Sequence, residues 1–426
     1  MNTQHSEYHR FIRLSLIVLV ITLLSAAGFN ALIDPYDLFG TTRIKGLNAL
    51  KPAAGTHIRL SKPYMVGRFS PRTLIGGNSR PELGLDPRDT CWTQADRPVF
   101  NIGIPGADIF MQARMLQHAI ASGAKKGDKR VFWGLDFMDF LDRRAALKDK
   151  RTVWPGSTHD YESRLAVTAN GQINPDRPWR KLKDTVLTLF SIDTLKDSLY
   201  TLFSQGNVNA TTRRVDGFNP ARDYVDAIAL EGQAVLFIQK NRMLAKTFAR
   251  TDLSVFGNGR QWSQDFETVS RILEYLKKNG VKATLFINPY HVDYLTLIAL
   301  SSRWQEFEQW KRQLQHLAKT HDVDLWDFAV LNDFTRESLA SAENRTLKWF
   351  WEPAHYKSAY GHLMLRQLLD APCPSREPKP VGALLTPDTM APHLRHERDA
   401  MMRYLKNNPK QLNRLRAYFP GTADGA

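Results

Sequence analysis

The sequence predicts an α/β protein, a three-layer α/β/α domain with a parallel sheet, preceded by an N-terminal transmembrane helix. Short apolar segments of strand length alternate along the chain with segments of helical length. An uncharged apolar stretch long enough to cross a bilayer lies near the N-terminus. With 426 residues, 43% of them hydrophobic, the chain can bury the core of one large domain.

The first element is the stretch "LSLIVLVITLLSAAGFNALI", residues 14–33. It contains no charged side chain, and about 20 apolar residues suffice for a membrane-spanning helix. Two arginines precede it and two aspartates follow it, so the positive-inside rule makes residues 1–13 a cytoplasmic tail. The rest of the chain is then expected in the periplasm or outside the cell.

A cleaved signal peptide is the alternative for this segment. The motif "SAAG" at residues 25–28 offers the small side chains that a signal peptidase requires. The apolar run continues beyond it through Phe29, Leu32 and Ile33, which favours an uncleaved anchor.

Charge and cysteine content limit the classes of partner. The formal net charge is +15, but the basic residues are scattered and form no nucleic-acid-binding motif. We therefore expect no nucleic-acid partner, whereas a membrane surface or an acidic polymer suits the charge. The two cysteines, Cys91 and Cys373, could pair in an oxidising compartment, and the sequence leaves that pairing open. No His/Cys cluster predicts a metal site, and we expect no cofactor.

The folded domain is predicted to begin after a connector at residues 34–72, which mixes turn-forming and basic residues. The periodicity predicts strands at residues 73–76, 99–102, 130–135, 282–289 and 324–328. It predicts intervening helices at residues 108–121, 266–280 and 303–321. Strands separated in this way pair in parallel through right-handed crossovers, which defines a domain at residues 73–372.

Two regions depart from this alternation. Residues 143–259 combine polar loops with helical stretches, and we interpret them as an insertion that caps the ligand site. Residues 373–426 are predicted to form a C-terminal tail with a charged helix near residues 391–406.

Ser79 is the first candidate for chemistry. It lies in "LIGGNSRPELGLDP" just after the first predicted strand, and ligands bind at the carboxyl ends of parallel strands. A Gly-x-Ser turn by itself is common. A nucleophilic serine needs a base, a group that orients the base, and donors for an oxyanion.

Other segments offer those partners. In "NIGIPGAD", Gly106 follows the second strand, where its N–H can approach a substrate oxygen. In "WFWEPAHYKSAYGHL", Glu352 precedes His355 by three residues, so its carboxylate can fix the imidazole tautomer. His291, which follows a predicted strand end, is the alternative base. Asp136 ends the third strand in "FWGLDFMDF".

These short blocks, in this order, resemble the SGNH hydrolase and acyltransferase superfamily. The matching segments are "GGNS", "IPGAD", "WGLD" and "EPAH". Together with "IDPYDLF" and "NIGIPGA", they resemble more narrowly the membrane-anchored proteins of polysaccharide O-acetylation, including the alginate acetylation type. The resemblance implies an SGNH, flavodoxin-like catalytic domain at residues 73–372 and a bacterial inner membrane with this domain in the periplasm.

The resemblance also implies the roles of the site residues. Ser79 is the expected nucleophile, His355 the base and Glu352 the group that orients it, with backbone N–H groups of Ser79 and Gly106 as the oxyanion hole. Three departures stand out: Asn78 replaces the usual Asp, Glu352 replaces the usual Asp, and Asp136 replaces the usual Asn. An ionised Asp136 would repel an oxyanion unless it were protonated.

Further residues are expected to line the site. Arg80 could pair with a carboxylate of an acidic glycan, although an Arg after a turn is commonly a solvated surface charge. The indoles of Trp349 or Trp351 suit the C–H groups of a sugar. The full set of expected lining residues is Asn78, Arg80, Asp136, His291, Trp349 and Trp351.

The sequence therefore predicts a periplasmic O-acyltransferase, an O-acetyltransferase by resemblance, that modifies an exported polysaccharide through an acyl-serine intermediate. A carbohydrate esterase or deacetylase is the first alternative, because it shares the first half-reaction. An inactive glycan-binding or scaffold domain is the second. With one predicted span, the chain is expected to receive acyl groups from a separate multi-span membrane acyltransferase.

Overall fold

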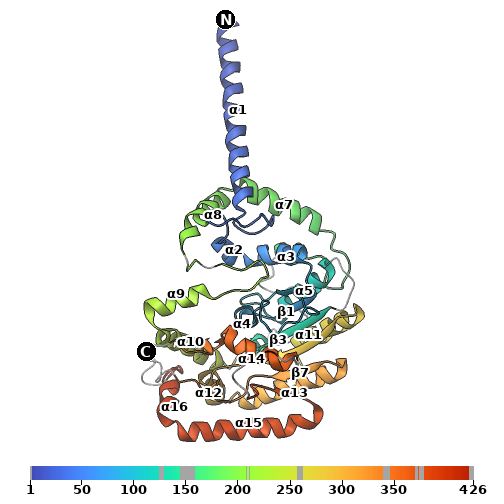
Figure 1. The fold of residues 1–426 in the computed structure, drawn as a ribbon, viewed down its shortest axis with the longest axis vertical. Helices are drawn as coiled ribbons and strands as arrows, with labels where there is room; N and C mark the ends of the chain where they lie inside the picture. Colours follow the sequence, from blue (N-terminus) through green and yellow to red (C-terminus); the bar gives the residue numbers. More distant parts are fainter. Residues whose placement is uncertain are drawn as a thin grey trace.

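The protein is a mixed α/β body from which one long helix projects (Figure 1). This helix, α1 (Asn2–Ile33), contains a segment long and apolar enough to cross a membrane by length and composition. The computed structural model describes residues 2–123, 129–143, 159–207, 209–210, 212–256, 262–338, 346–369, 373 and 379–421.

A central, mostly parallel sheet organises the body, as the sequence predicts. Its strand order is β10-β7-β6-β3-β1-β2, and only β10 runs antiparallel to its neighbour. The strands are β1 (Thr73–Gly76), β2 (Val99–Asn101), β3 (Arg130–Leu135), β6 (Lys282–Ile287), β7 (Asp324–Asp327) and β10 (Ala383–Leu384). The prediction missed β10 because a pair of residues is too short to show a strand period.

Successive side chains of the strands enter two different hydrophobic clusters, as the pleat requires. Leu74, Val131 and Leu285 belong to one cluster, together with residues of three helices: α5 (Ile109–Ser122), α11 (Gln264–Lys278) and α13 (Trp304–His321). Ile75 and Phe132 belong to the other, which includes residues of α14 (Ser358–Leu368). Helix α15 (Pro387–Asn407) packs on α13 and confirms the helix predicted in the tail.

The order of the strands creates one special position at the end of β1. From β1 the chain passes to β2 on one side, and it later returns to β3 on the other side. Connections therefore diverge at the carboxyl end of β1, which is where open α/β sheets bind ligands. The short helix α4 (Ser79–Gly84) begins there.

The expected connector at residues 34–72 differs from the prediction. It contains α2 (Pro52–Thr56) and α3 (Ile58–Phe69), and Met65 and Val66 of α3 belong to the main core. Helix α3 was not predicted because its sequence lacks a clear amphipathic pattern: it contains an internal proline, Pro63, and a lysine, Lys62, on its buried side.

The insertion begins and ends on a small antiparallel sheet of β4 (Asp142–Arg143) and β5 (Leu253–Ser254). Its helices occupy two places. Helices α7 (Arg177–Phe190) and α8 (Ile192–Phe203) contact α1. Helix α10 (Gln233–Phe248) packs on α12 (Val292–Leu300) and β8 (Phe350–Glu352), and α9 (Arg222–Glu231) packs on α10 (Figure 1). The parts of the predicted insertion at residues 144–158 and 257–259 lie outside the described residues.

The cysteine pairing that the sequence leaves open is settled by a disulfide. Cys91, in the segment between α4 and β2, is bonded to Cys373, which follows α14. The bond joins two segments of the second hydrophobic cluster that are 282 residues apart in the sequence.

A close approach of α4 and α14 gives a test of this arrangement. A Cβ added to Gly361 of α14 would lie 1.8 Å from the carbonyl oxygen of Gly84 in α4, so the helices must separate. We expect Gly361→Ala to lower the free energy of unfolding by about 1–3 kcal/mol, measured by denaturant unfolding in detergent. The matched change Gly206→Ala, where a Cβ meets nothing within 4 Å, should stay within about 0.5 kcal/mol of wild type. Equal stability of the two variants would contradict this packing.

Candidate active site

The turn that presents Ser79 depends on a glycine and a capping side chain. Gly77 has a φ of 136°, and a Cβ there would lie 2.8 Å from the carbonyl oxygen of Gly134. Asn78 caps α4, because its side-chain oxygen accepts the N–H of Arg80 at 2.9 Å. Ser79 is therefore the first residue of α4, half-buried at the carboxyl end of β1.

The structure brings Ser79, His355 and Glu352 together. The Oγ of Ser79 lies 2.7 Å from Nε2 of His355, although the two residues are 276 positions apart. The other ring nitrogen, Nδ1, contacts Oε1 of Glu352. A hydroxyl, an imidazole and a carboxylate in this sequence of contacts form the arrangement that activates a serine.

A tight antiparallel hairpin positions the last two of these residues. Glu352 ends β8, and His355 begins β9 (His355–Tyr356), where it pairs with Glu352. The N–H of Ala354 in the intervening turn donates to Oε2 of Glu352 at 2.9 Å. The turn thus holds the carboxylate against the imidazole and leaves the other carboxylate oxygen satisfied.

The electrostatics favour a neutral imidazole beside an ionised carboxylate. Burial lowers the pKa of His355, and the positive charges of Lys240 and Arg80 act in the same direction, against the attraction of Glu352. Burial alone would raise the pKa of Glu352, but the interaction and hydrogen bond with His355, the charge of Lys240 and the N–H of Ala354 together hold that pKa below its ordinary value. A neutral His355 can accept a proton from Ser79 at neutral pH.

Two residues of the insertion complete the surroundings of this triad. The hydroxyl of Tyr224 in α9 lies 3.2 Å from Nδ1 of His355. The Nζ of Lys240 in α10 lies 3.6 Å from Oε1 of Glu352. Neither residue was predicted to lie at the site, because neither belongs to a local motif. From the sequence only the helical stretches that contain them could be predicted.

Arg80 corrects an expectation about the surface. It is neither solvated nor free for a glycan carboxylate, since its side chain is buried and forms an ion pair with Asp136. Its Nε donates to the carbonyl oxygen of Ala354 at 2.7 Å. Arg80 therefore connects the serine turn to the histidine hairpin. Asp136 is committed to this pair and to capping the N–H of Met138, so it is not an oxyanion donor.

A second acid, the half-buried Asp139, fixes Asn78. The Nδ2 of Asn78 donates to Asp139 at 2.9 Å, and Gln112 donates to the same carboxyl oxygen at 2.7 Å. Burial and the nearby Asp136 carboxylate raise the pKa of Asp139 well above its ordinary value. Asn78 is thus held at both ends, which suits a residue that shapes the turn rather than one that contacts substrate.

A buried cluster of opposite charges holds α4 in place through Glu82. Glu82 accepts hydrogen bonds from Nζ of Lys62 at 2.7 Å and from Nε of Arg213 at 2.8 Å. Burial lowers the pKa of Lys62 to about 8, even though Glu82 attracts its charge. Removing one partner would leave a buried charge uncompensated, so this cluster ties α3, α4 and the insertion to one geometry.

The glycines after β2 have different surroundings. Gly106 is exposed, with a φ of 66°, in a turn closed by the N–H of Ala107 donating to Ile104 at 3.1 Å. A Cβ there would meet no atom within 4 Å, so space is open beside its backbone. Gly103 instead lies against the serine turn, where a Cβ would be 2.7 Å from the carbonyl oxygen of Asn78. Its N–H already donates to the side chain of Asn101 at 3.0 Å.

The remaining predicted lining residues have other surroundings. His291 caps α12 with Nδ1 and contacts the carbonyl oxygen of Glu337 through Nε2 at 2.8 Å, so both ring nitrogens are engaged away from Ser79. Trp349 is buried in the second core cluster against Phe334, which removes it as a sugar platform. Trp351 is half-buried, and its ring centroid lies 5.7 Å from that of Tyr224.

Comparison with known proteins gives no relative for this chain. No family model matches the chain, and no curated protein matches it significantly. Its interpretation therefore depends on the geometry of its own residues.

The position of Lys240 predicts a pH effect. We expect Lys240→Met to raise the pKa of His355, because a cation that opposes protonation of the imidazole is removed. As the pH is lowered, the rate at which a fluorophosphonate probe labels Ser79 should then begin to fall at a higher pH than in wild type, because His355 is protonated earlier. At alkaline pH the rate should be unchanged. Lys246→Met, at an exposed position of the same helix, is the control and should leave the profile in place. An identical acid limb in Lys240→Met would refute this role.

Proposed function

We propose that this chain is a membrane-anchored serine acyltransferase of the SGNH type, with a three-layer α/β/α catalytic domain. The observation that carries the proposal is the contact series from Ser79 through His355 to Glu352 at the carboxyl end of β1. We further propose that it transfers acetyl groups to hydroxyls of an exported polysaccharide, the activity that the resemblance of its motifs implies.

The reaction begins when Nε2 of His355 takes the hydroxyl proton of Ser79 and Oγ attacks the carbonyl carbon of an acyl donor. Backbone N–H groups of Ser79 and Gly106 stabilise the oxyanion of the tetrahedral intermediate. The C–O bond to the leaving group breaks, and His355 returns the proton to that group. Ser79 is left as an acyl ester.

The second half-reaction repeats these steps in reverse. His355 takes the proton of a sugar hydroxyl, the sugar oxygen attacks the acyl-serine carbonyl, and the bond to Ser79 breaks as its oxygen is reprotonated. Attack by water would make the same protein an esterase or deacetylase, the alternative function. An inactive scaffold is less well supported, because the hydrogen-bonded triad carries a base with a lowered pKa.

The supply of acyl groups follows from the architecture. In the described part of the chain, α1 is the one helix long and apolar enough to cross a membrane. A single span offers no path for an activated acyl group across a bilayer. We therefore propose that the domain lies in the periplasm of a bacterial inner membrane and receives acyl groups from a separate multi-span acyltransferase.

An acyl-enzyme trap tests the enzymatic role. The full chain in detergent is incubated with p-nitrophenyl acetate and candidate glycans, and intact mass is followed together with product acetylation. We expect an acetyl adduct on wild type, none on Ser79→Ala, and a loss in rate of about 10²–10⁴ in Glu352→Gln. Ser301→Ala, at a half-buried serine on a helix end, is the matched control. Acetyl transfer that persists in Ser79→Ala would exclude the proposal, and the ratio of acetylated glycan to free acetate separates transferase from esterase.

Trp351 provides a test of glycan binding. Its half-buried indole stands beside Tyr224, which contacts the catalytic histidine. We expect Trp351→Ala to raise the KM for the glycan by about 3- to 10-fold, the effect of losing one aromatic contact, while hydrolysis of p-nitrophenyl acetate is retained. Parallel losses with both substrates would mean that Trp351 supports the fold of the site.

A further inference from the structure

Helix α7 presents its apolar side to the outside. The side chains buried against the body are polar, namely Arg180, Asp184 and Thr188. The large exposed hydrophobic residues of the helix are Trp179, Leu182, Val186, Leu187 and Phe190. Trp179 alone is 75% exposed. A helix on the surface of a water-soluble domain shows the opposite pattern, with its apolar side inward.

Helix α8 repeats this inversion. Its buried residues are Thr194, Ser198 and Thr201. The exposed ones include Ile192, Leu199, Tyr200 and Phe203, of which Phe203 is 80% exposed. Helices α7 and α8 form a helical hairpin. A single residue, Ser191, connects them, and its side chain caps α8. We call these two helices the α7–α8 hairpin.

Ion pairs and hydrogen bonds hold the inward side of α7 against the body, so the inversion is a property of the fold. Asp184 accepts hydrogen bonds from the hydroxyl of Tyr64 at 2.8 Å and from Nε of Arg164 at 2.6 Å, and it pairs with Arg180. Rotating α7 about its axis to bury its apolar side would expose these ion pairs and leave the hydroxyl of Tyr64 without its hydrogen-bond partner.

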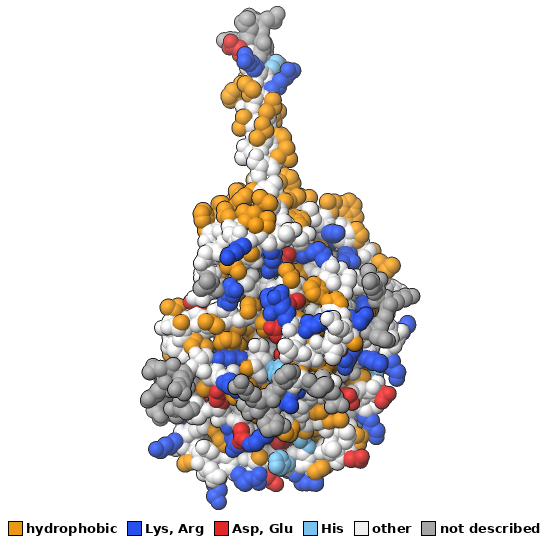
Figure 2. All heavy atoms as spheres, viewed as in Figure 1, with side chains coloured by type: hydrophobic (Ala, Val, Ile, Leu, Met, Phe, Trp, Pro, Cys, Tyr) orange, Lys and Arg blue, Asp and Glu red, His pale blue; other side chains and the backbone are white. Residues whose placement is uncertain are grey.

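The hairpin surrounds the base of α1. Both of its helices contact α1, and Asn30 joins them: its Nδ2 donates to the carbonyl oxygen of Leu189 at 2.9 Å, and its Oδ1 accepts the hydroxyl of Ser198 at 2.8 Å. Figure 2 shows hydrophobic side chains gathered on the end of the body from which α1 emerges. The exposed apolar sides of α7 and α8 therefore lie where a membrane crossed by α1 would begin.

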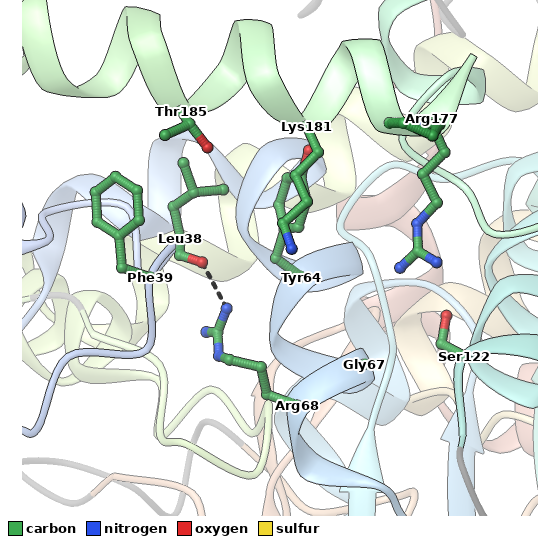
Figure 3. Close-up of a pocket in the computed structure, with 10 residues that line it drawn as sticks. Leu38, Phe39, Tyr64, Gly67, Arg68, Ser122, Arg177, Lys181 and Thr185 are labelled. Atoms are coloured by element: carbon green, nitrogen blue, oxygen red, sulfur yellow. Dashed lines mark hydrogen bonds between the residues drawn. The ribbon is translucent and has the colours of Figure 1, made fainter. Parts of the chain in front are cut away.

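We propose that the α7–α8 hairpin lies in the interface of the bilayer that α1 crosses, with its apolar side among the lipid acyl chains. The charge of the hairpin suits this location, because Lys183 and Lys196 are exposed near the apolar residues and can reach lipid phosphates. Figure 3 shows Arg177 and Lys181 extending from α7 into a cavity of about 600 Å³, with Arg177 pointing toward Ser122; Arg68 of α3 also lines this cavity. Basic side chains thus line the inner as well as the outer side of α7.

A second membrane contact changes what the anchor does. One spanning helix leaves a domain free to tilt over the membrane, whereas an embedded hairpin adds a second attachment in the plane of the bilayer. Since α1 and the hairpin are joined through buried hydrogen bonds of Asn30, the whole body would keep one face toward the lipid.

Fluorescence quenching of the full chain in lipid tests this proposal. A polarity-sensitive nitrobenzoxadiazole label is attached at Val186→Cys or Phe203→Cys, with Met402→Cys on α15 as the control, a position 64% exposed and at the far end of the body from α1. The native cysteines form a disulfide and take no label. Each protein is reconstituted as one copy per nanodisc of phosphatidylethanolamine and phosphatidylglycerol.

We expect the labels at positions 186 and 203 to emit at shorter wavelength than the control and to be quenched at least several-fold more strongly by lipids with a nitroxide on the acyl chain. Iodide in the buffer should quench the control label preferentially. Equal behaviour of all three labels would overturn the proposal. Protection from iodide without quenching by the nitroxide lipid would also overturn it, because protein would then cover the hairpin. If circular dichroism shows that a labelled variant is unfolded, Leu182 or Tyr200 carries the label instead.

Discussion

The buried guanidinium of Arg80 is the contact on which the geometry of the site depends. It follows the serine directly, pairs with Asp136 at the end of β3, and donates to the carbonyl oxygen of Ala354 inside the histidine hairpin. Three segments far apart in the sequence thus meet on one planar cation whose several donors point in fixed directions. A lysine has one ammonium group in place of these directed donors, and it could not satisfy both partners with the same geometry.

Around that contact the protein buries several charged groups. The Lys62–Glu82–Arg213 cluster, the Arg80–Asp136 pair and the nearby Asp139 all lie within or beside the serine turn. Burying such groups is costly in solvation and is tolerated only when every charge keeps its partner. The result is a turn with few alternative positions, which is what transfer of a proton between Ser79 and His355 requires.

The sequence shows some of this and not the rest, for physical reasons. The strands and the relation of Glu352 to His355 are readable because periodicity and close spacing are local. The position of Ser79 at the end of β1 follows from the same periodicity. The burial of Arg80, the contacts of Tyr224 and Lys240, and the two helices of the expected connector depend on tertiary partners, and local patterns carry no record of these. The outward orientation of the apolar sides of α7 and α8 could not be predicted for another reason. The amphipathic period of a helix is the same whichever side faces the body.

The separation of Ser79 and His355 along the chain has a consequence for biosynthesis. The serine leaves the ribosome 276 residues before its base, and the hairpin that carries the base packs on helices of the insertion. A partly made chain therefore holds an ordinary alcohol with no partner to deprotonate it. The contact between Ser79 and His355 forms only after almost the whole polypeptide has been synthesised and folded, so under the proposed mechanism an unfinished chain could not react with activated acyl groups.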